Sequence, residues 1–461
     1  MAEQKLMNRW LVVAGAILIQ LCLGAIYAWS AFTGALSAAV EKGGYGFTAS
    51  QTQWVFSLGL VTFAVVMVWA GRQQAKIGPR PIAIAGGAVL GLGYILGGFL
   101  GKTFAAQLIC IGLVGGAGIG LGYVVPIAVG VKWFPDKKGL ITGLAVAGFG
   151  FGATLWVKLA GGFKTLLWVV PWDFAGLLKA ADGFLGLPGV QAVFVIYGVA
   201  FLVLVVLGSL VMVNPPAGYK PAGWTPPPPS AAASGAVDMT SGEMMRTPQF
   251  YMIWLTFCFS AMAGLMVIGC IALFGKDALL ASGAVADAAA AAAAAGSAMA
   301  LYAIFNGLGR IIWGSLSDKI GRKVSITLMC ALQGAIMLAF FYMGRTELGL
   351  IAAACIIGFN FGGNFALFPA ATADFFGNKN VGLNYGWVFL SYGVAGIVGP
   401  QIAGYFKDAA TVAGAAGGSV EAWRMPFIIA GLACLGGAVL AAAVRPPRPK
   451  PAIAPTKETN A

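Results

Sequence analysis

Arg310 is a lone cation in a stretch of apolar and glycine residues, "IFNGLGRIIWG", that runs from Ile304 to Gly314 without an acidic residue. The polar cluster that follows includes Asp318, eight residues further along the chain. On a helix this separation is about 12 Å. Because an arginine side chain reaches only about half that distance, Arg310 does not bring its guanidinium to the polar cluster. A charge left among apolar residues is costly, so Arg310 is a candidate functional residue.

The chemistry that suits Arg310 is the binding of a carboxylate, because its planar fork donates two parallel N–H bonds. A buried salt bridge is the alternative, but all 15 Asp and Glu fall at the ends of apolar runs, in loops or in the termini. We therefore expect the partner to be an anion that arrives from solution. Asn306 lies four residues earlier, on the same face of a helix, where it can orient Arg310 or the anion.

The segment that carries Arg310 is one of twelve apolar runs between Trp10 and Val444. Runs of about 17 to 25 residues cross a ~30 Å hydrocarbon core as helices. The chain is 59% hydrophobic and 9% charged, with a mean hydropathy of +0.87. Runs that recur along the whole chain exclude a lone signal peptide, and their continuity excludes the alternating strands of a membrane barrel. The prediction is an all-α integral membrane protein with twelve transmembrane helices in the lipid bilayer.

The distribution of basic residues predicts the orientation of these helices. With both termini in the cytoplasm, 18 of the 28 Lys and Arg lie on that side, 9 lie on the other side, and Arg310 lies in the membrane. This asymmetry follows the positive-inside rule. It accounts for the formal charge of +13 without a nucleic-acid partner.

The cysteines and histidines argue against metal, cofactor and disulfide chemistry. All seven Cys fall inside apolar runs, and the chain has no His. Such cysteines are expected to be small packing residues. A membrane-embedded enzyme would need a nucleophile with a base or a metal, and the sequence supplies neither, so we expect no enzyme activity.

The polar breaks divide the chain into two six-helix halves. The predicted ranges are 1–213 for the N-terminal half, 214–248 for a proline-rich cytoplasmic linker, 249–444 for the C-terminal half and 445–461 for a disordered basic cytoplasmic tail. Two insertions remain. Residues 161–189 are expected along the outer interface, and residues 275–296 contain an alanine run that is expected to extend a helix.

An internal repeat relates the halves. "GRQQAKIGPR" from Gly71 and "GSLSDKIGRK" from Gly314 start 243 residues apart, and the pairs Pro126/Pro369 and Gly139/Gly382 share that offset. Three landmarks at one spacing indicate duplication. Parallel repeats of this kind place the substrate site near the midplane, between the halves.

At these residues the chain resembles the major facilitator superfamily, which implies the fold of that family. Its loop motif of glycines, an acid and basic residues locks helix ends together in one conformation. The resemblance assigns this conformational lock to Asp318, Lys319 and Arg322 in the second half and to Lys76 and Arg80 in the first. Ala75 stands where the acid of the first half is expected.

More narrowly, the chain is similar to the oxalate/formate antiporter family, bacterial relatives of monocarboxylate transporters. The matching pieces include "YAWS" at Tyr27, "WFPDKKGL" at Trp133, "NGLGRIIWGSLSDKIGR" at Asn306 and "ALFPAATADFFG" at Ala366. The resemblance implies a monomeric secondary transporter of small carboxylates in a bacterial cytoplasmic (inner) membrane. By this resemblance, the animal relatives have an aspartate at the position of Asn306 that exchanges a proton during transport. The amide of Asn306 cannot exchange a proton in this way.

The resemblance also nominates an aromatic cage around Arg310. Its members are Tyr27, Tyr123, Phe149, Phe361, Phe365, Phe389 and Tyr392. By the same resemblance, the oxalate carrier of the family has a lysine at the position of Tyr392, which would be a second cation. One fixed charge favours a monocarboxylate such as formate, lactate or pyruvate over oxalate.

Several alternatives stay open at this point. Lys158, at the end of the fifth run, is expected to carry its ammonium to the outer interface but is the next candidate for a second cation. Transport can proceed as anion exchange, with protons or against hydroxide. An oxalate/formate antiporter is the second interpretation, and a sensor that binds a ligand without transport is a remote third.

Overall fold

The computed structural model describes most of the chain. The described residues are 7–42, 44–134, 138–166, 170–174, 176–216, 218–221, 223, 238–377, 380–412, 420–445 and 447. Within this part, twelve helical segments are long and apolar enough to cross a membrane. The predicted number of spans is therefore confirmed.

The first six spans contain two interrupted helices. The first span is broken by η1, a single 3₁₀ segment, and the fourth contains a π-helix, η3. In chain order the elements are α1 (Arg9–Leu23), η1 (Gly24–Ala28), α2 (Ser30–Ser37), η2 (Val40–Lys42), α3 (Ala49–Ile77), α4 (Pro79–Leu100), α5 (Phe104–Gln107), η3 (Leu108–Gly115), α6 (Gly116–Trp133), α7 (Lys138–Gly161) and α9 (Gly189–Ser209).

The last six spans are continuous helices. After the short α10 (Ser241–Met244) they are α11 (Pro248–Ala281), α12 (Ala288–Ile320), α13 (Arg322–Met343), α14 (Glu347–Phe376), α15 (Val381–Val412) and α16 (Arg424–Ala443), which η5 (Val420–Trp423) precedes. Asp287 caps α12 by accepting from the Ala290 N–H at 2.8 Å. The expectation that the alanine run lies in a helix is confirmed.

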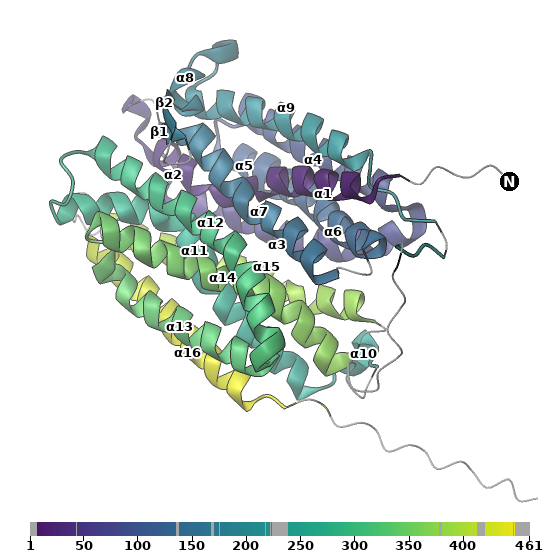
Figure 1. Ribbon diagram of the computed structural model, residues 1–461. Helices are drawn as coiled ribbons and strands as arrows, with labels where there is room; N and C mark the ends of the chain where they lie inside the picture. Colours follow the sequence, from purple (N-terminus) through teal and green to yellow (C-terminus); the bar gives the residue numbers. More distant parts are fainter. Residues whose placement is uncertain are drawn as a thin grey trace, which may run out of the picture.

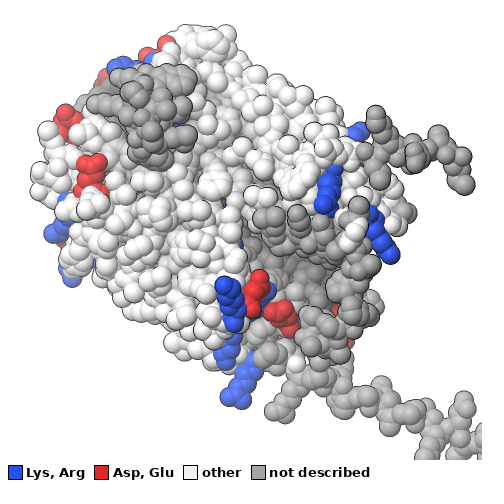
Figure 2. Space-filling model, in the orientation of Figure 1, with Lys and Arg blue, Asp and Glu red and all other residues white. Residues whose placement is uncertain are grey.

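The two sets of six spans lie side by side, with the purple-to-blue helices in one half and the green-to-yellow helices in the other (Figure 1). We call the side with Arg9 and Ala443 the near side, and the opposite side, where α3 begins and α15 ends, the far side. On the face in Figure 2 the charged side chains gather toward these two ends, with an uncharged band between them. A band of this kind suits the hydrocarbon core of a bilayer.

The internal repeat is visible in the backbone. α4 and α13 begin and end 243 residues apart. Each is preceded by a glycine with φ of 89°, Gly78 and Gly321. A residue with a Cβ rarely adopts this left-handed conformation, so the glycines allow the tight corner between successive spans. The spacing found in the sequence therefore corresponds to equivalent helices.

The segment 161–189, which was expected only to lie along the outer interface, is not entirely helical. It contains a short antiparallel hairpin, β1 (Phe163–Leu166) and β2 (Val170–Phe174), in which Phe163 pairs with Phe174 and Leu166 with Val170. α8 (Leu177–Ala180) and η4 (Phe184–Gly186) follow. The hairpin lies at the far side of the bundle (Figure 1). A short segment that mixes β-branched, aromatic and polar residues can satisfy its backbone groups as a two-stranded pair as well as in a helix.

The end of the predicted linker contacts the second half. The Met239 N–H donates to the Phe376 carbonyl at 2.9 Å, and the Asn384 amide donates to the Met239 carbonyl at 3.0 Å. Residues 224–237 of the linker, and the predicted tail apart from Arg445 and Pro447, lie outside the described residues.

The helix that carries Arg310 packs against α14 through glycines. A Cβ added at Gly309 would clash with the Phe359 carbonyl, and one added at Gly362 would clash with the Asn306 carbonyl. Backbone atoms are the neighbours on both sides, so no side chain can move aside. This close approach fixes the position of α12, and hence of Arg310, relative to α14.

Gly362→Ala is expected to destabilise the protein, since the added methyl group must push α12 and α14 apart. Overpacking of this kind costs about 1 to 3 kcal/mol, which should lower the melting temperature in detergent by several degrees. Gly436→Ala in α16 is the matched control, because a Cβ there meets no atom within 4 Å. Equal melting temperatures for the two variants would contradict the packing argument.

Candidate functional site

Arg310 lies at the contact between the halves and is 3% exposed. Its Nε donates to the Asn306 Oδ1 at 3.1 Å, one helical turn earlier on α12. Its Nη1 donates to the Val146 carbonyl of α7, in the first half, at 3.0 Å. The guanidinium therefore links the two halves of the bundle, and the four-residue spacing from Asn306 places an amide directly beside it.

Two donors at this place have no acceptor. Arg310 Nη2 and Asn306 Nδ2 are buried, and neither has a described acceptor within hydrogen-bond geometry, although the Tyr27 and Tyr123 hydroxyls lie close to the Arg310 side chain. A buried donor without an acceptor costs about 1 to 3 kcal/mol, and more when it is charged. Arg310 also makes no salt bridge within the described chain. The two donors are of the kind that bind the oxygens of a carboxylate, which would supply both the acceptors and the charge that the described part of the chain lacks here.

Aromatic rings cover the guanidinium. The Arg310 Cζ lies 4.1 Å from the centroid of Phe365 and 5.7 Å from that of Phe149. Contacts at these distances stabilise a cation through the ring quadrupole. A site that excludes water would strengthen the pairing of the guanidinium with an anion.

The structure brings all seven nominated aromatic residues into one cluster. Each is at most 6% exposed. The rings connect through the pairs Tyr27–Phe149 (5.0 Å), Tyr123–Phe149 (5.4 Å), Tyr27–Phe361 (5.8 Å), Phe361–Phe365 (5.3 Å), Phe365–Tyr392 (5.6 Å) and Phe389–Tyr392 (4.9 Å).

Tyr27 and Tyr392 join the two halves across this cluster. Their hydroxyl oxygens lie 2.8 Å apart, in hydrogen-bond distance, and the side chains are 1% and 0% exposed. Tyr27 comes from the 3₁₀ segment η1, which interrupts the first span, and Tyr392 comes from α15. In the described part of the chain, the cation that contacts these rings is Arg310.

Sequence reasoning missed several members of the site, of which Phe63 and a backbone carbonyl are two. Phe63 of α3 is 1% exposed and packs against Tyr123 (5.0 Å), Phe389 (5.6 Å) and Tyr392 (5.9 Å). In the sequence it is one apolar residue in an apolar run and carries no separate signal. Another member is the Val146 carbonyl, a backbone group that no side-chain pattern reveals.

The nominated lock residues divide into two groups on the near side. In the second half Arg322 pairs with Asp318 at 2.5 Å and with Asp374 of α14 at 3.4 Å. This network ties the ends of α12, α13 and α14 together. Lys319, and Lys76 and Arg80 in the first half, are exposed and form no ion pair with any described residue.

Lys158 lies outside the aromatic cluster. It is half-buried at the contact of α7 with α12, and its Nζ donates to the Ser297 Oγ of the other half at 3.4 Å. Beside it, the Thr154 hydroxyl donates to the Ala300 carbonyl at 2.9 Å. These residues hold the halves together closer to the far side than Arg310 does.

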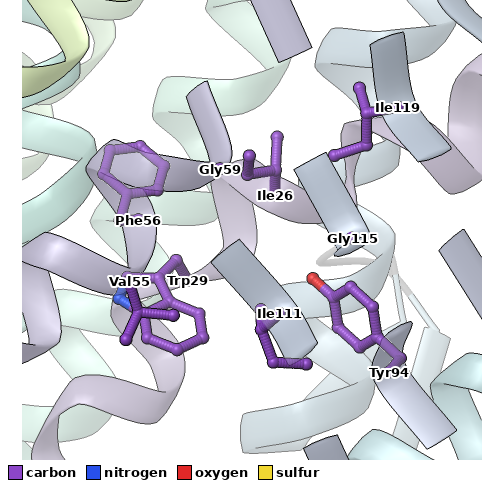
Figure 3. Close-up of a pocket in the computed structure, with 9 residues that line it drawn as sticks. All are labelled: Ile26, Trp29, Val55, Phe56, Gly59, Tyr94, Ile111, Gly115 and Ile119. Atoms are coloured by element: carbon purple, nitrogen blue, oxygen red, sulfur yellow. The ribbon is translucent and has the colours of Figure 1, made fainter. Parts of the chain in front are cut away.

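A small pocket lies inside the first half (Figure 3), and Arg310 is not among the residues that line it. None of the residues that line it is charged, and the Tyr94 hydroxyl points into it (Figure 3). The lining residues are Ile26, Trp29, Val55, Phe56, Gly59, Tyr94, Ile111, Gly115 and Ile119. The pocket offers no cation to an anion, so the Arg310 cluster remains the candidate site.

Asn306→Asp is expected to weaken anion binding at neutral pH by about tenfold or more, because the new carboxylate pairs with Arg310 and competes with the ligand. The affinity should recover in part as the pH falls, since protonation removes the competing charge. Initial rates of labelled-anion exchange over a pH series would measure this. Asn306→Ala is the control: it also weakens binding but should show no recovery at low pH.

Comparison with known proteins identifies the family. The model of the Major Facilitator Superfamily matches residues 18–400 and 265–461. An uncharacterized MFS-type transporter of Escherichia coli (strain K12), YhjX, is 32% identical over 396 residues, which cover 85% of this chain and 86% of the relative.

Two further relatives carry transport functions in their names. The oxalate:formate antiporter of Oxalobacter formigenes is 27% identical over 453 residues, which cover 96% of this chain and 93% of the relative. Apicoplast pyruvate carrier 1 of Toxoplasma gondii is 25% identical over 456 residues, which cover 83% of this chain and 81% of the relative. From the family model, these relatives and the twelve spans, we conclude that the chain belongs to the major facilitator superfamily, as a membrane transporter related to the oxalate/formate antiporters and not an enzyme.

Proposed function

We propose that this protein is a secondary active transporter of small carboxylate anions, with a monocarboxylate such as formate, lactate or pyruvate as substrate. The observation that carries the proposal is the pair of buried donors without acceptors, Arg310 Nη2 and Asn306 Nδ2. Arg310 anchors the carboxylate, Asn306 orients it, and the aromatic cluster excludes water. Because the site joins the halves, their rocking would open it to each side of the membrane in turn.

The charge of the site supports a monocarboxylate. Arg310 contacts the rings as a cation, whereas Tyr392 presents a neutral hydroxyl that bonds to Tyr27. A dianion would leave its second charge in a site of low dielectric without a counter-charge, which is strongly unfavourable. The name of the pyruvate carrier relative agrees with this choice. The second candidate is oxalate/formate antiport, which the Oxalobacter formigenes relative favours.

Anion exchange is the proposed mode of coupling. Without substrate, the carrier would have to return across the membrane with the uncompensated charge of Arg310, and a second anion removes that cost. Cotransport of the protonated acid is the alternative. We place the protein in a bacterial cytoplasmic membrane as a monomer, with the near side and both termini in the cytoplasm. The proposed halves are residues 1–213 and 249–444, joined by a linker over 214–248.

Counterflow in proteoliposomes tests the proposal. Vesicles loaded in turn with unlabelled formate, lactate, pyruvate or oxalate are given the matching labelled acid, with and without a pH gradient. Accumulation of a labelled monocarboxylate but not of oxalate is the expected result. Accumulation that persists without a pH gradient supports exchange, whereas net uptake as fast as exchange would argue for proton cotransport.

Two outcomes would overturn parts of the proposal. Rapid oxalate exchange would show that a second cation reaches the site, and Lys158 would be the first to test. Saturable binding of a carboxylate without flux in vesicles would indicate a sensor with a transporter fold.

A further inference from the structure

The N-terminus of α3 is capped by two different parts of the molecule. A helix start leaves N–H groups without intrahelical partners. Within the first half, the Thr48 hydroxyl accepts from the Gln51 N–H at 3.1 Å, and the Gln51 side chain accepts from the Thr48 N–H at 3.0 Å. This capping box leaves the N–H groups of Ala49 and Ser50 to be satisfied by another part of the molecule.

Those two N–H groups donate to the second half. The Ala49 N–H donates to Asp408 Oδ1, and the Ser50 N–H donates to Asp408 Oδ2, each at 2.9 Å. Asp408 lies near the far-side end of α15. The carboxylate therefore uses both oxygens on a helix start that belongs to the other half, where the helix dipole also favours a negative charge.

The residues around Asp408 are arranged for this contact. A Cβ on Gly404, one turn earlier, would lie 2.9 Å from the Ser50 Cα, so glycine permits the close approach of α15 to α3. One more turn toward the start of α15, the Gln401 amide is 3.4 Å from the Ser57 hydroxyl. Gly404 and Asp408 follow Gln401 by three and seven residues, so all three residues lie on one face of α15. A continuous strip of α15 thus faces α3 on the far side.

The neighbouring residue holds α15 in its own half. Lys407 pairs with Asp277 of α11 at 2.7 Å, and the Trp423 indole donates to the same carboxylate oxygen at 2.8 Å. Because Lys407 fixes this end of α15 to the second half, a pull on Asp408 is transmitted to that half as a whole.

We propose that Asp408 is the far-side latch of this transporter: its carboxylate holds the halves together by capping α3, and the far side opens only when these two bonds break. In the orientation proposed above, the far side faces the outside of the cell. The inference goes beyond the proposed function, since it concerns the equilibrium between conformations and not the choice of substrate.

Distance measurements between the halves test the latch without any carboxylate. Spin labels are attached to V40C in the first half and Y405C in the second, at positions that are 67% and 66% exposed. The background replaces the seven native cysteines and is first checked for monodispersity in nanodiscs. Double electron–electron resonance then gives the distribution of distances across the far side.

Asp408→Asn is expected to shift the ratio of closed to open far side by about tenfold or more toward open, since the amide has no charge and one acceptor oxygen. Ala49→Pro should shift it less in the same direction. Proline fits the first position of a helix but removes the Ala49 N–H, one of the two donors.

Asp182→Asn is the matched control. The Asp182 carboxylate also caps a helix start, accepting from the Gly189 N–H at 2.9 Å, but both residues belong to the first half. This variant should leave the distances unchanged. If Asp408→Asn gives the same distribution as the unmodified background and Asp182→Asn, the latch is wrong. If Asp408→Asn does not give a folded protein, Ala49→Pro decides in its place. Failure of carboxylate exchange would count against the proposed function alone, because the label distances involve no substrate.

Discussion

Arg310→Ala is expected to abolish carboxylate exchange, with initial rates at least about 100-fold below those of the unmodified protein. Removing one partner of a desolvated, hydrogen-bonded charge pair costs about 2 to 5 kcal/mol. Arg310 alone supplies the charge among the described contacts of the cluster, and it donates to the Val146 carbonyl of the opposite half. Its loss therefore removes both the anion anchor and one link between the halves. Counterflow in proteoliposomes measures the rate.

Arg310→Lys separates these two contributions. A lysine keeps the positive charge but loses the planar fork, so it is expected to retain weak exchange with a raised KM. Stabilisation by added carboxylate in a thermal-shift assay provides a second readout, since a ligand that binds only the folded protein raises its melting temperature. Near-normal flux in the alanine variant would show that Arg310 is not the anion site.

Tyr392→Lys is expected to broaden the substrate preference from monocarboxylates to include oxalate. The residue packs against Phe365 at 5.6 Å, and Phe365 covers the Arg310 guanidinium at 4.1 Å. An ammonium at this place would supply the second counter-charge that a dianion needs. The ratio of oxalate to monocarboxylate exchange should rise by about 100-fold, which corresponds to one desolvated charge pair of about 2 to 5 kcal/mol.

Tyr392→Phe is the control for this substitution. It removes the hydroxyl bond to Tyr27 but adds no charge. Exchange rates should change, because a contact between the halves is lost, while oxalate should remain excluded. If the phenylalanine variant accepts oxalate as well as the lysine variant does, size and hydrogen bonding determine selectivity at this position, and the charge argument fails.

Much of the fold could be predicted because membrane spans are a local property of the sequence. A run such as Pro81–Leu100 must be a helix in lipid, since no water is present to satisfy its backbone. The 243-residue repeat likewise predicted equivalent corners, which the structure has at Gly78 and Gly321. The short hairpin at Phe163–Phe174 was not predicted, because outside the apolar core a stretch of mixed β-branched and aromatic residues has alternatives to a helix.

The distance of Arg310 from the polar cluster and its lack of a nearby acid can also be predicted by counting residues along the sequence. Its distance from Asp318 along a helix and the scarcity of acids inside the runs are both sequence properties. The same helical spacing predicts the contact with Asn306, for which the structure gives 3.1 Å.

Contacts between the halves could not be obtained this way. Phe63, the Val146 carbonyl and the bond between Tyr27 and Tyr392 enter the site because helices more than a hundred residues apart in the chain meet there. The cap of Asp408 on α3 joins residues 358 and 359 positions apart.

The sequence by itself therefore determined the membrane class, the number of spans, the internal repeat and the buried cation, because each depends on composition or on spacing along one helix. Only the tertiary structure decided which rings and carbonyls surround Arg310, and which carboxylate closes the far side. Those choices depend on how two six-helix units face each other, and any apolar face or exposed aspartate fits many such partners until packing selects one.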